Sequence, residues 1–420
     1  MITLGIETSC DETALALLET RENNGVIECR VISSLIHSQA ELHSAYGGVF
    51  PTLAKREHSK NLLPLLKKIL EDSKKLLGGE KAQIAEDQFE GKIVAIKKDL
   101  EIRNMDLAIS FDDIDFLKHI PAIDKIAVTE GPGLEPALWV GISFAKVLSD
   151  LWSIPLIPIN HMEGHIVGSL LDSEVKNDEW QKLKVLQFPA TALLISGGHT
   201  ELIEVESSDV LKNKKADKMS DGLFSSAFPL KYTIIGQTKD DAVGEAFDKV
   251  ARLLGLPYPG GPHVSKLANE AEKENIQLDI RLPRPMINSD DMNFSFSGLK
   301  TAVLYAVRKH EKDTGSLDDN FKKGLAREFE EAVNETLVKK LRKSVESIGA
   351  KTIIVGGGVI ANNKLRKSFE ELAKEYDIPI YLPSKHVSGD NALMIALAGA
   401  LNKNKNNTEL KAQGTMRLGE

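Results

Sequence analysis

Two histidines four residues apart are the side chains best placed to do chemistry in this chain. His161 and His165 share one face of an expected helix, about one turn (~5.4 Å) apart, and this spacing lets one rigid element offer two ligands to a divalent metal. The strand-like run 153–159 leads into them, so we expect the pair at the carboxyl end of a strand, where α/β folds bind ligands. Such pairs also occur on exposed helices without a metal, and the pair alone leaves both interpretations open.

Three glycine-bearing loops supply a second set of candidates. The apolar run 192–196 enters the loop 196–200, and the run 352–355 enters Gly356-Gly357-Gly358. A third loop, 258–262, follows an expected helix. Glycine lets a loop turn backbone N–H groups toward an anion, so three such loops together favour nucleotide or phosphate binding over ordinary turns.

Two polar side chains accompany these loops. Asp248 lies beside the buried stripe of its helix, a suitable place for a carboxylate that reaches a ribose hydroxyl. Asn362 follows the triple glycine and is expected to be either a helix N-cap or a base-contacting side chain.

The elements that must position these residues alternate in a mixed α/β pattern. Apolar runs at 2–6 and 14–18 flank the polar turn 7–13, which indicates a hairpin. Further strands are expected at 125–128, 153–159, 192–196 and 352–355, and helices at 53–70, 137–151, 241–254, 299–312, 318–347 and 391–401. Residues 72–121 and 212–235 lack regular spacing, and we expect both to be surface insertions, the first of them partly mobile.

Composition is that of an ordinary soluble protein, with 42% hydrophobic and 27% charged residues in 420. No apolar run approaches the ~20 residues of a membrane span, and the N-terminus runs straight into an expected core strand rather than a leader. Two cysteines exclude a disulfide framework and favour a reducing, cytoplasmic compartment. A net charge of −8 argues against wrapping nucleic acid unaided, but not against a nucleic-acid substrate held by local basic patches or a partner.

Four smaller features receive structural interpretations. Cys10 is expected to be a packed side chain rather than a nucleophile, because no histidine is near it in sequence. His37, His43 and His58 fall in a polar helical region and are expected only to solvate it.

Eight segments, in order along nearly the whole chain, resemble the universal TsaD family of tRNA N6-adenosine threonylcarbamoyltransferases. The matching segments are 5–13, 161–165, 195–200, 244–249, 258–262, 294–300, 357–366 and 388–392. The segment Gly47-Gly48-Val49-Phe50-Pro51 is similar to the bacterial and organellar branch. The resemblance implies the actin, sugar kinase and Hsp70-like (ASKHA) α/β fold, with two ribonuclease-H-like lobes around a central cleft. We expect residues 1–150 and about 383–420 in one lobe, with an insertion at about 72–121, and 151–382 in the other, with an insertion at about 205–237.

The resemblance also implies a ligand set and a substrate site. The histidines matching His161 and His165 and the aspartate matching Asp390 bind one divalent ion in the family, Fe²⁺ or Zn²⁺. Asp11 and Glu12 approach the phosphate and the metal and are the candidate catalytic residues. Substrate contacts fall on Leu194, Ile195, Ser196, Gly197, Gly198, Asp248, Gly261 and Asn362. The chain departs from the family where Ser265 replaces an acidic residue and where Ser388-Gly389 precedes Asp390, and neither departure touches the metal ligands.

The implied reaction moves a threonylcarbamoyl group from threonylcarbamoyl-adenylate to N6 of the adenosine next to the anticodon, in tRNAs that read codons starting with A. Implied partners are a TsaB-like paralogue and a TsaE-like ATPase, or a second copy of the chain, with the segment 53–70 as our expected docking surface and no membrane involved.

Three other activities compete with that interpretation. An ASKHA-type kinase or ATPase would favour Mg²⁺ on oxygen ligands, whereas paired histidines suit a softer metal. A metalloprotease is disfavoured because Glu163 lies about 200° round the helix from His161 and points away. A non-catalytic scaffold of the same fold would be expected to lose the ligands, and this chain keeps all three.

Overall fold

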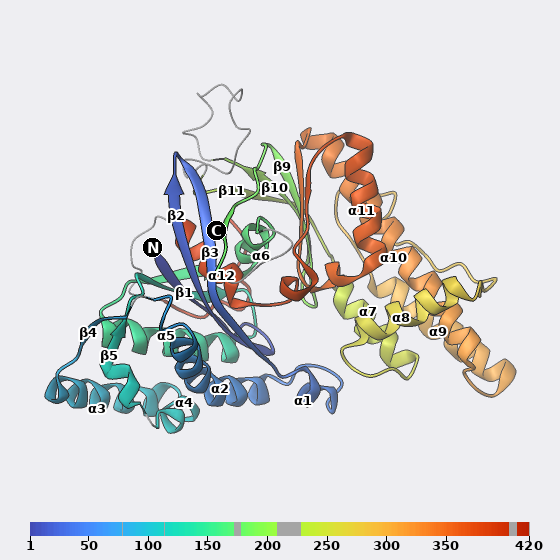
Figure 1. The fold of residues 1–420 in the computed structure, drawn as a ribbon. Coiled ribbons are helices and arrows are strands. Elements are labelled where there is room, and N and C mark those ends of the chain that lie inside the picture. The colour runs from blue at the N-terminus through green and yellow to red at the C-terminus, as the bar shows by residue number, and fades with distance from the viewer. Residues whose placement is uncertain (78, 113, 172–177, 208–227, 403–409, 420) are drawn as a thin grey trace.

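Two β-sheets with a layer of helices between them form the body of the protein in this computed structural model (Figure 1). The structure describes residues 1–420 except 78, 113, 172–177, 208–227, 403–409 and 420.

The first sheet has the strand order β7-β6-β1-β2-β3-β8. Its strands are β1 (Ile2–Glu7), β2 (Glu12–Asn23), β3 (Val26–Ser38), β6 (Lys125–Gly131), β7 (Leu156–Asn160) and β8 (Trp180–Lys182). Strands β1, β2 and β3 form an antiparallel meander, and β6 and β7 continue the sheet parallel to β1.

The second sheet has the order β11-β10-β9-β12-β13 and repeats that topology. Its strands are β9 (Ala190–Ile195), β10 (Thr200–Glu206), β11 (Lys231–Gln237), β12 (Thr352–Gly356) and β13 (Ile380–Tyr381). Strands β9, β10 and β11 are an antiparallel meander, and β12 and β13 run parallel to β9. Two sheets with this one connectivity are what two ribonuclease-H-like lobes require, so the expected ASKHA fold is confirmed.

Helices α6 (His161–Gly168) and α12 (Ala392–Leu401) form the layer between the sheets. Helix α12 packs on β1, β2 and β6 and against α6, and α6 packs on β9 and β12. No residue of α12 is charged, and a helix that is apolar all round is stable only in a core. One buried cluster therefore joins side chains of both sheets through these two helices.

The outer faces of the sheets are covered by amphipathic helices. The first sheet carries α2 (Pro51–Asp72) and α5 (Glu135–Trp152), preceded by the short α1 (Ala40–Ser44). The second half carries α7 (Val243–Leu253), α8 (Gly260–Lys273), α9 (Ser297–Thr314), α10 (Asp319–Ile348) and α11 (Asn363–Tyr376). In the described part of the chain, no helix combines the length and apolar character that crossing a membrane would require.

The segment 72–121, which we expected to be irregular, is built of regular elements, so that expectation was wrong. It contains β4 (Glu80–Gln83), α3 (Glu86–Arg103), α4 (Met105–Ser110) and β5 (His119–Pro121). Phe89, Ile93, Leu100 and Leu107 anchor it to the core of the first half, and their mixed spacing beside many charged residues hid the pattern.

Three further expectations need correction or restriction. Within 212–235, residues 212–227 lie outside the described part of the chain, but β11 begins at Lys231 and is a regular strand. Strands β7 and β8 belong to the first sheet, which therefore reaches beyond residue 150, where we expected the first lobe to end. His43 and His58 are fully buried rather than solvated, whereas His37 is exposed.

A close approach of β1 and α12 leads to the first prediction. A Cβ at Gly5 would lie 2.3 Å from the carbonyl oxygen of Ala392, so Gly5→Val must push α12 off the sheet. We expect a loss of about 1–3 kcal/mol in the free energy of unfolding, measured by urea denaturation, because such overpacking cannot relax. Gly91→Ala is the control, since Gly91 lies in α3 with open space around it and the change should stabilise the protein by up to about 1 kcal/mol. Equal stability of the two variants would contradict this packing.

Candidate metal centre

His161, His165 and Asp390 converge between the two sheets, as predicted. The Nε2 atoms of His161 and His165 lie 3.3 Å and 3.1 Å from the same oxygen, Oδ1 of Asp390. The side chains of His161 and His165 are 7% and 3% exposed, whereas the Asp390 side chain keeps 20% of its surface accessible. The cluster is therefore buried on the histidine side and partly accessible on the aspartate side.

Capping interactions fix the elements that carry these ligands. Helix α6 begins at His161, directly after β7, because Asn160 is its N-cap and accepts a hydrogen bond from Met162 N at 2.9 Å. Asp390 precedes the N-cap of α12, Asn391, whose side chain accepts from Met394 N and donates to the carbonyls of Val387 and Gly389. The loop bearing the third ligand is thus closed onto the helix that follows it.

The donor atoms fit a divalent transition metal. All three ligand atoms lie within 4.8 Å of one another. Ligands about 2.1 Å from a tetrahedral ion are about 3.3 Å apart, close to the N···O separations found here. Two neutral imidazoles and one carboxylate are ligands for iron or zinc rather than for magnesium, and three protein ligands leave a position open for substrate.

Glu7 is a supporting residue that the sequence analysis missed. Its Oε2 lies 3.1 Å from Nδ1 of His161, and Ser9 Oγ lies 3.2 Å from the same nitrogen. Thr129 donates to that carboxylate oxygen at 2.5 Å, and Ser9 N donates to the other. A carboxylate on the far nitrogen of a ligating histidine fixes the ring and its tautomer. The available signal was an acidic residue that ends an otherwise apolar strand.

The buried charges of the site shift one another's pKa values. Burial opposes ionisation of Asp390, but the two imidazoles outweigh it and hold the pKa of that carboxyl well below its usual range. Burial likewise opposes the charged form of His161, and the carboxylates of Asp390 and Glu7 overcome it and raise the pKa of His161. The site is therefore built to hold positive charge, whether a proton or a metal ion supplies it.

The turn between β1 and β2 carries Asp11 and Glu12. Asp11 is 8% exposed. Burial, the Asp11 carboxylate and the Asp390 carboxylate together raise the pKa of Glu12 to about 10. Burial and Asp11 also raise the pKa of Cys10, so this thiol is not an activated nucleophile and the structural interpretation of Cys10 stands.

The loop after β9 faces the metal ligands, but two of its predicted contacts are buried. Gly197 and Gly198 are exposed, with open space where a Cβ would be, whereas Leu194 and Ile195 are fully buried within β9. His199, which we did not single out, belongs to the same loop. Burial and the nearby imidazoles of the cluster lower the pKa of His199 to about 4.

The predicted substrate contacts Asp248, Gly261 and Asn362 lie in the second half. The side chains of Asp248 and Asn362 form hydrogen bonds with other residues of that half. Asp248 Oδ1 accepts from Gly260 N at 2.7 Å, and so holds the loop that begins α8. Burial, with a smaller effect of the Asp11 carboxylate, raises the pKa of Asp248. Gly261, next to that bond, has open space where a Cβ would be.

The N-cap role of Asn362 is confirmed. Its Oδ1 accepts from Leu365 N at 3.0 Å, and its Nδ2 donates to Ser265 Oγ at 2.8 Å and to Glu330 Oε1 at 2.6 Å. Glu330 is only 3% exposed. Glu330 thus supplies a carboxylate near Ser265, which stands where the family pattern has an acidic residue. Sequence spacing alone offers no signal for this role of Glu330.

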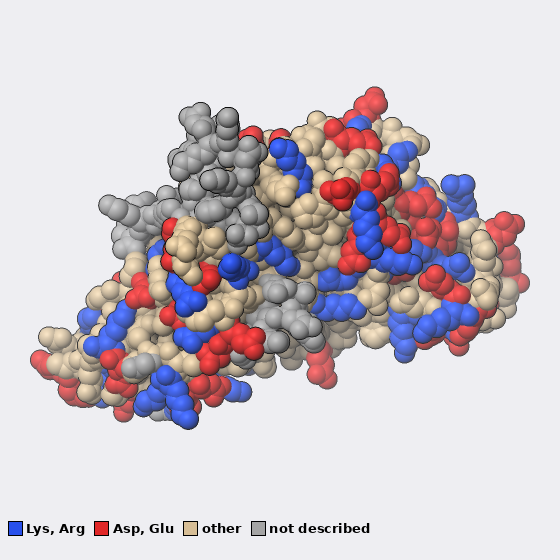
Figure 2. All heavy atoms as spheres, turned by 45° about the horizontal axis from the view of Figure 1, so that its top comes forward, with Lys and Arg blue, Asp and Glu red and all other residues tan. Residues whose placement is uncertain are grey.

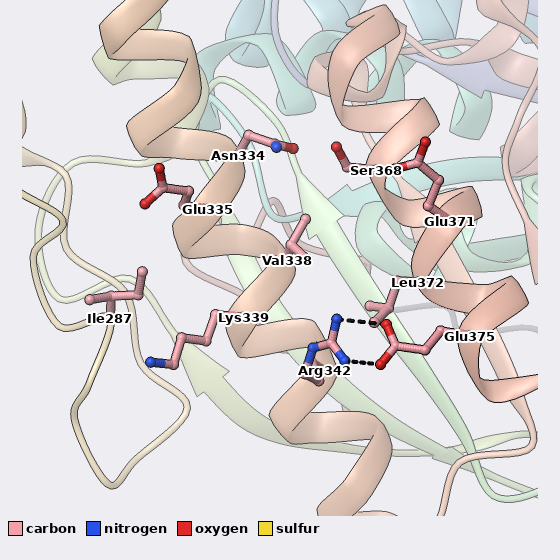
Figure 3. Close-up of a pocket in the computed structure, with 10 residues that line it drawn as sticks. All are labelled: Ile287, Asn334, Glu335, Val338, Lys339, Arg342, Ser368, Glu371, Leu372 and Glu375. Atoms are coloured by element: carbon pink, nitrogen blue, oxygen red, sulfur yellow. Dashed lines mark hydrogen bonds and ion pairs between the residues drawn. The ribbon is translucent and has the colours of Figure 1, made fainter.

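A groove of about 570 Å³ lies away from this cluster, between α10 and α11 (Figure 3). Arg342 and Glu375 pair across it, and Asn334 and Ser368 point into it from opposite helices. None of its lining residues is a predicted site residue.

Comparisons with known proteins identify the family of this chain. The TsaD family profile, described as tRNA N6-adenosine threonylcarbamoyltransferase, matches residues 30–77, 117–228 and 218–397. It leaves 78–116 unmatched, the part of the chain that contains α3 and α4.

Curated relatives carry the same description over nearly their whole length. A tRNA N6-adenosine threonylcarbamoyltransferase of Methylobacillus flagellatus is 38% identical over 401 residues, 96% of this chain and 92% of the relative. Relatives of the same name from Nitrosospira multiformis and Thermosipho africanus are 36% and 37% identical, covering 99% and 95% of this chain and 94% and 93% of their own length. The chain therefore belongs to the TsaD family of tRNA N6-adenosine threonylcarbamoyltransferases, acyltransferases that modify tRNA.

Proposed function

We propose that the protein transfers the threonylcarbamoyl group of threonylcarbamoyl-adenylate to N6 of the adenosine next to the anticodon, in tRNAs that read codons starting with A. We further propose that the transfer requires one Fe²⁺ or Zn²⁺ ion held by His161, His165 and Asp390. The observation that carries the proposal is the meeting of these ligands, from segments 225 residues apart, on a single carboxylate oxygen.

The ion, when bound, would supply a Lewis acid that stabilises negative charge on the carbamoyl or phosphate oxygen of the donor. Glu7 and Ser9 hold the His161 ring so that its Nε2 faces Asp390. The partly exposed Asp390 leaves the donor a path to this centre, and the buried face of α6 keeps water from the opposite side.

The loop and turn residues around the centre can position the two reactants. Backbone N–H groups of Gly197 and Gly198 can hold the phosphate or carboxylate of the donor, because this glycine loop is open there and lies near the cluster, whereas Ser196 N already donates to the carbonyl oxygen of His199. Gly261, beside the loop held by Asp248, can contact the nucleoside part. Asp11 can orient the incoming amine, and a neutral Glu12 can donate a hydrogen bond to it or to the donor.

Recruitment of the tRNA would need local contacts or partners. Basic and acidic side chains are interspersed over the face shown in Figure 2, without one large basic field. Because phosphate binding relies on clustered cations, this surface suits a protein assisted by a TsaB-like paralogue, a TsaE-like ATPase or a second copy of itself. The α2 surface, residues 53–70 above all, remains our candidate docking site for such a partner.

The ligand set gives the second prediction. Asp390→Ala and His161→Ala should each lose the bound metal and at least about 100-fold in transfer rate, because the site would keep too few ligands. The assay combines the protein, cognate partners, labelled adenylate donor and tRNA, with and without a chelator, and metal content is measured in parallel. Glu163→Gln is the matched control on the same helix, since Glu163 bonds Tyr232 outside the ligand set. No transfer by the native protein with its partners and metal would refute the function.

The raised pKa of His161 gives the third prediction. Because this pKa is raised well above that of an ordinary histidine, the metal-free imidazole keeps its proton to higher pH, and a metal ion must displace that proton. Metal affinity should therefore rise with pH by about tenfold per unit, until the pH passes the raised pKa. Competition with a chromophoric chelator between about pH 6 and about pH 8 checks this, and a pH-independent affinity would contradict it.

The raised pKa of Glu12 gives the fourth prediction. A carboxyl with a pKa of about 10 is neutral at pH 7, so Glu12→Gln should retain most of the transfer rate, within about threefold. Asp11→Asn removes a charge from the same turn and should cost about 100-fold or more. Single-turnover rates of the two variants test this. The proposed roles of Asp11 and Glu12 are wrong if Glu12→Gln lowers the transfer rate more than Asp11→Asn does.

A further inference from the structure

Three buried polar side chains beside the Asp11–Glu12 turn have no part in the ligand set. Gln39 is 2% exposed, and His43 and His58 are fully buried. Gln39 directly follows β3, His43 lies in α1 and His58 lies in α2. Gln39 is hydrogen-bonded to both histidines, so the three side chains form one series. Buried polar groups of this kind are costly unless all are paired, so their arrangement calls for a reason beyond stability.

The chain of bonds starts at the turn. His58 Nε2 lies 3.0 Å from the carbonyl oxygen of Cys10, which can only accept, so this nitrogen carries the proton. The bare Nδ1 then accepts from Thr13 Oγ1 at 2.8 Å and from Gln39 Nε2 at 3.2 Å. One imidazole therefore bonds residues on both sides of Asp11 and Glu12.

The chain continues from the turn to the surface helices. Gln39 N donates to the carbonyl oxygen of Asp11 at 2.9 Å, and Gln39 Oε1 lies 3.2 Å from Nε2 of His43. His43 Nδ1 accepts from Phe50 N, the residue before α2, at 3.3 Å. Each donor faces an acceptor, so the orientation of every side chain depends on that of the next.

Burial keeps this chain in the neutral form that its bonds require. It lowers the pKa of His58 to about 4 and also lowers the pKa of His43. A second proton on His58 would turn the contact with Gln39 Nε2 into a donor–donor contact and leave Thr13 Oγ1 as the acceptor at that nitrogen.

We propose that Gln39, His43 and His58 are positioning residues, which hold the Asp11–Glu12 turn in the orientation that transfer requires and tie it to the α1–α2 segment. This inference rests on the proposed function of the turn. It adds that the surface from α1 to the start of α2 and the reacting centre move together, because a directional set of hydrogen bonds connects them.

The test compares His58→Leu, which removes all three bonds of the ring, with His58→Gln, whose side-chain amide can still donate to the Cys10 carbonyl. His58→Leu should lower kcat for transfer by on the order of tenfold to 100-fold, with the KM for the adenylate donor and the metal content nearly unchanged. His58→Gln should recover part of kcat. Gln39→Leu should behave like His58→Leu and guards against a single variant that fails to fold.

Ser344→Ala is the matched control, because Ser344 and Thr191 form a fully buried hydrogen bond of 2.7 Å in the other half. It should lower stability by a similar amount and leave kcat unchanged. If His58→Leu keeps the native kcat while the native protein is active, the positioning role is overturned and the proposed function stands.

A second measurement is independent of turnover. Amide hydrogen exchange in residues 9–13 and 39–50 should become faster in His58→Leu and stay native in Ser344→Ala. If the native protein is inactive, the proposed function fails. If amide exchange is unchanged in His58→Leu, the proposed connection between the Asp11–Glu12 turn and the α1–α2 segment is overturned, whatever the activity.

Discussion

A carboxylate between two sheets needs compensating positive charge, and the interior of this protein is arranged around that requirement. Asp390 receives it from His161, whose pKa is raised, and Glu7 lies on the other side of the same ring. Removing His161 would leave two buried carboxylates without that compensating charge, which costs several kcal/mol. A divalent ion satisfies the same carboxylates and lets both imidazoles be neutral, so the protein scaffold favours the ion electrostatically before any substrate arrives.

The repeated sheet topology explains how one site can draw on such distant segments. Each half packs its central strands against the shared helical layer that α6 and α12 form. The first half supplies Glu7, Asp11 and Glu12 from the β1–β2 turn, and the second supplies the 196–199 loop after β9. The β1–β2 turn and the 196–199 loop are equivalent in the repeated topology. The candidate site therefore lies between two related turns that carry different side chains.

Much of the fold could be predicted from local patterns, and spacing alone singled out the histidine pair while leaving open whether it binds a metal. Helical spacing found α2, α5, α7, α9, α10 and α12 to within a few residues at each end. Asp390 lies far along the chain and could be joined to His165 only through the family resemblance, since spacing carries no information on contacts over 225 residues. Leu194 and Ile195 matched substrate positions, but a central strand buries both side chains.

The residues that prediction missed are those whose role depends on tertiary neighbours. Glu7 and Glu330 are carboxylates buried beside partners from other elements, and His58 was mistaken for a solvated side chain in a polar helix. In α3 the apolar positions are separated by charged residues, and only contact with the first half makes the helix stable.

The order in which the ligands are synthesised has a consequence for biogenesis. Both histidines precede most of the second half, whereas the aspartate immediately precedes the last helix of the described chain. A nascent polypeptide can thus complete neither the central layer nor the coordination sphere until that helix has left the ribosome and docked. Capture of the ion would then stabilise only chains whose two halves have already closed, so metal loading would mark the end of folding.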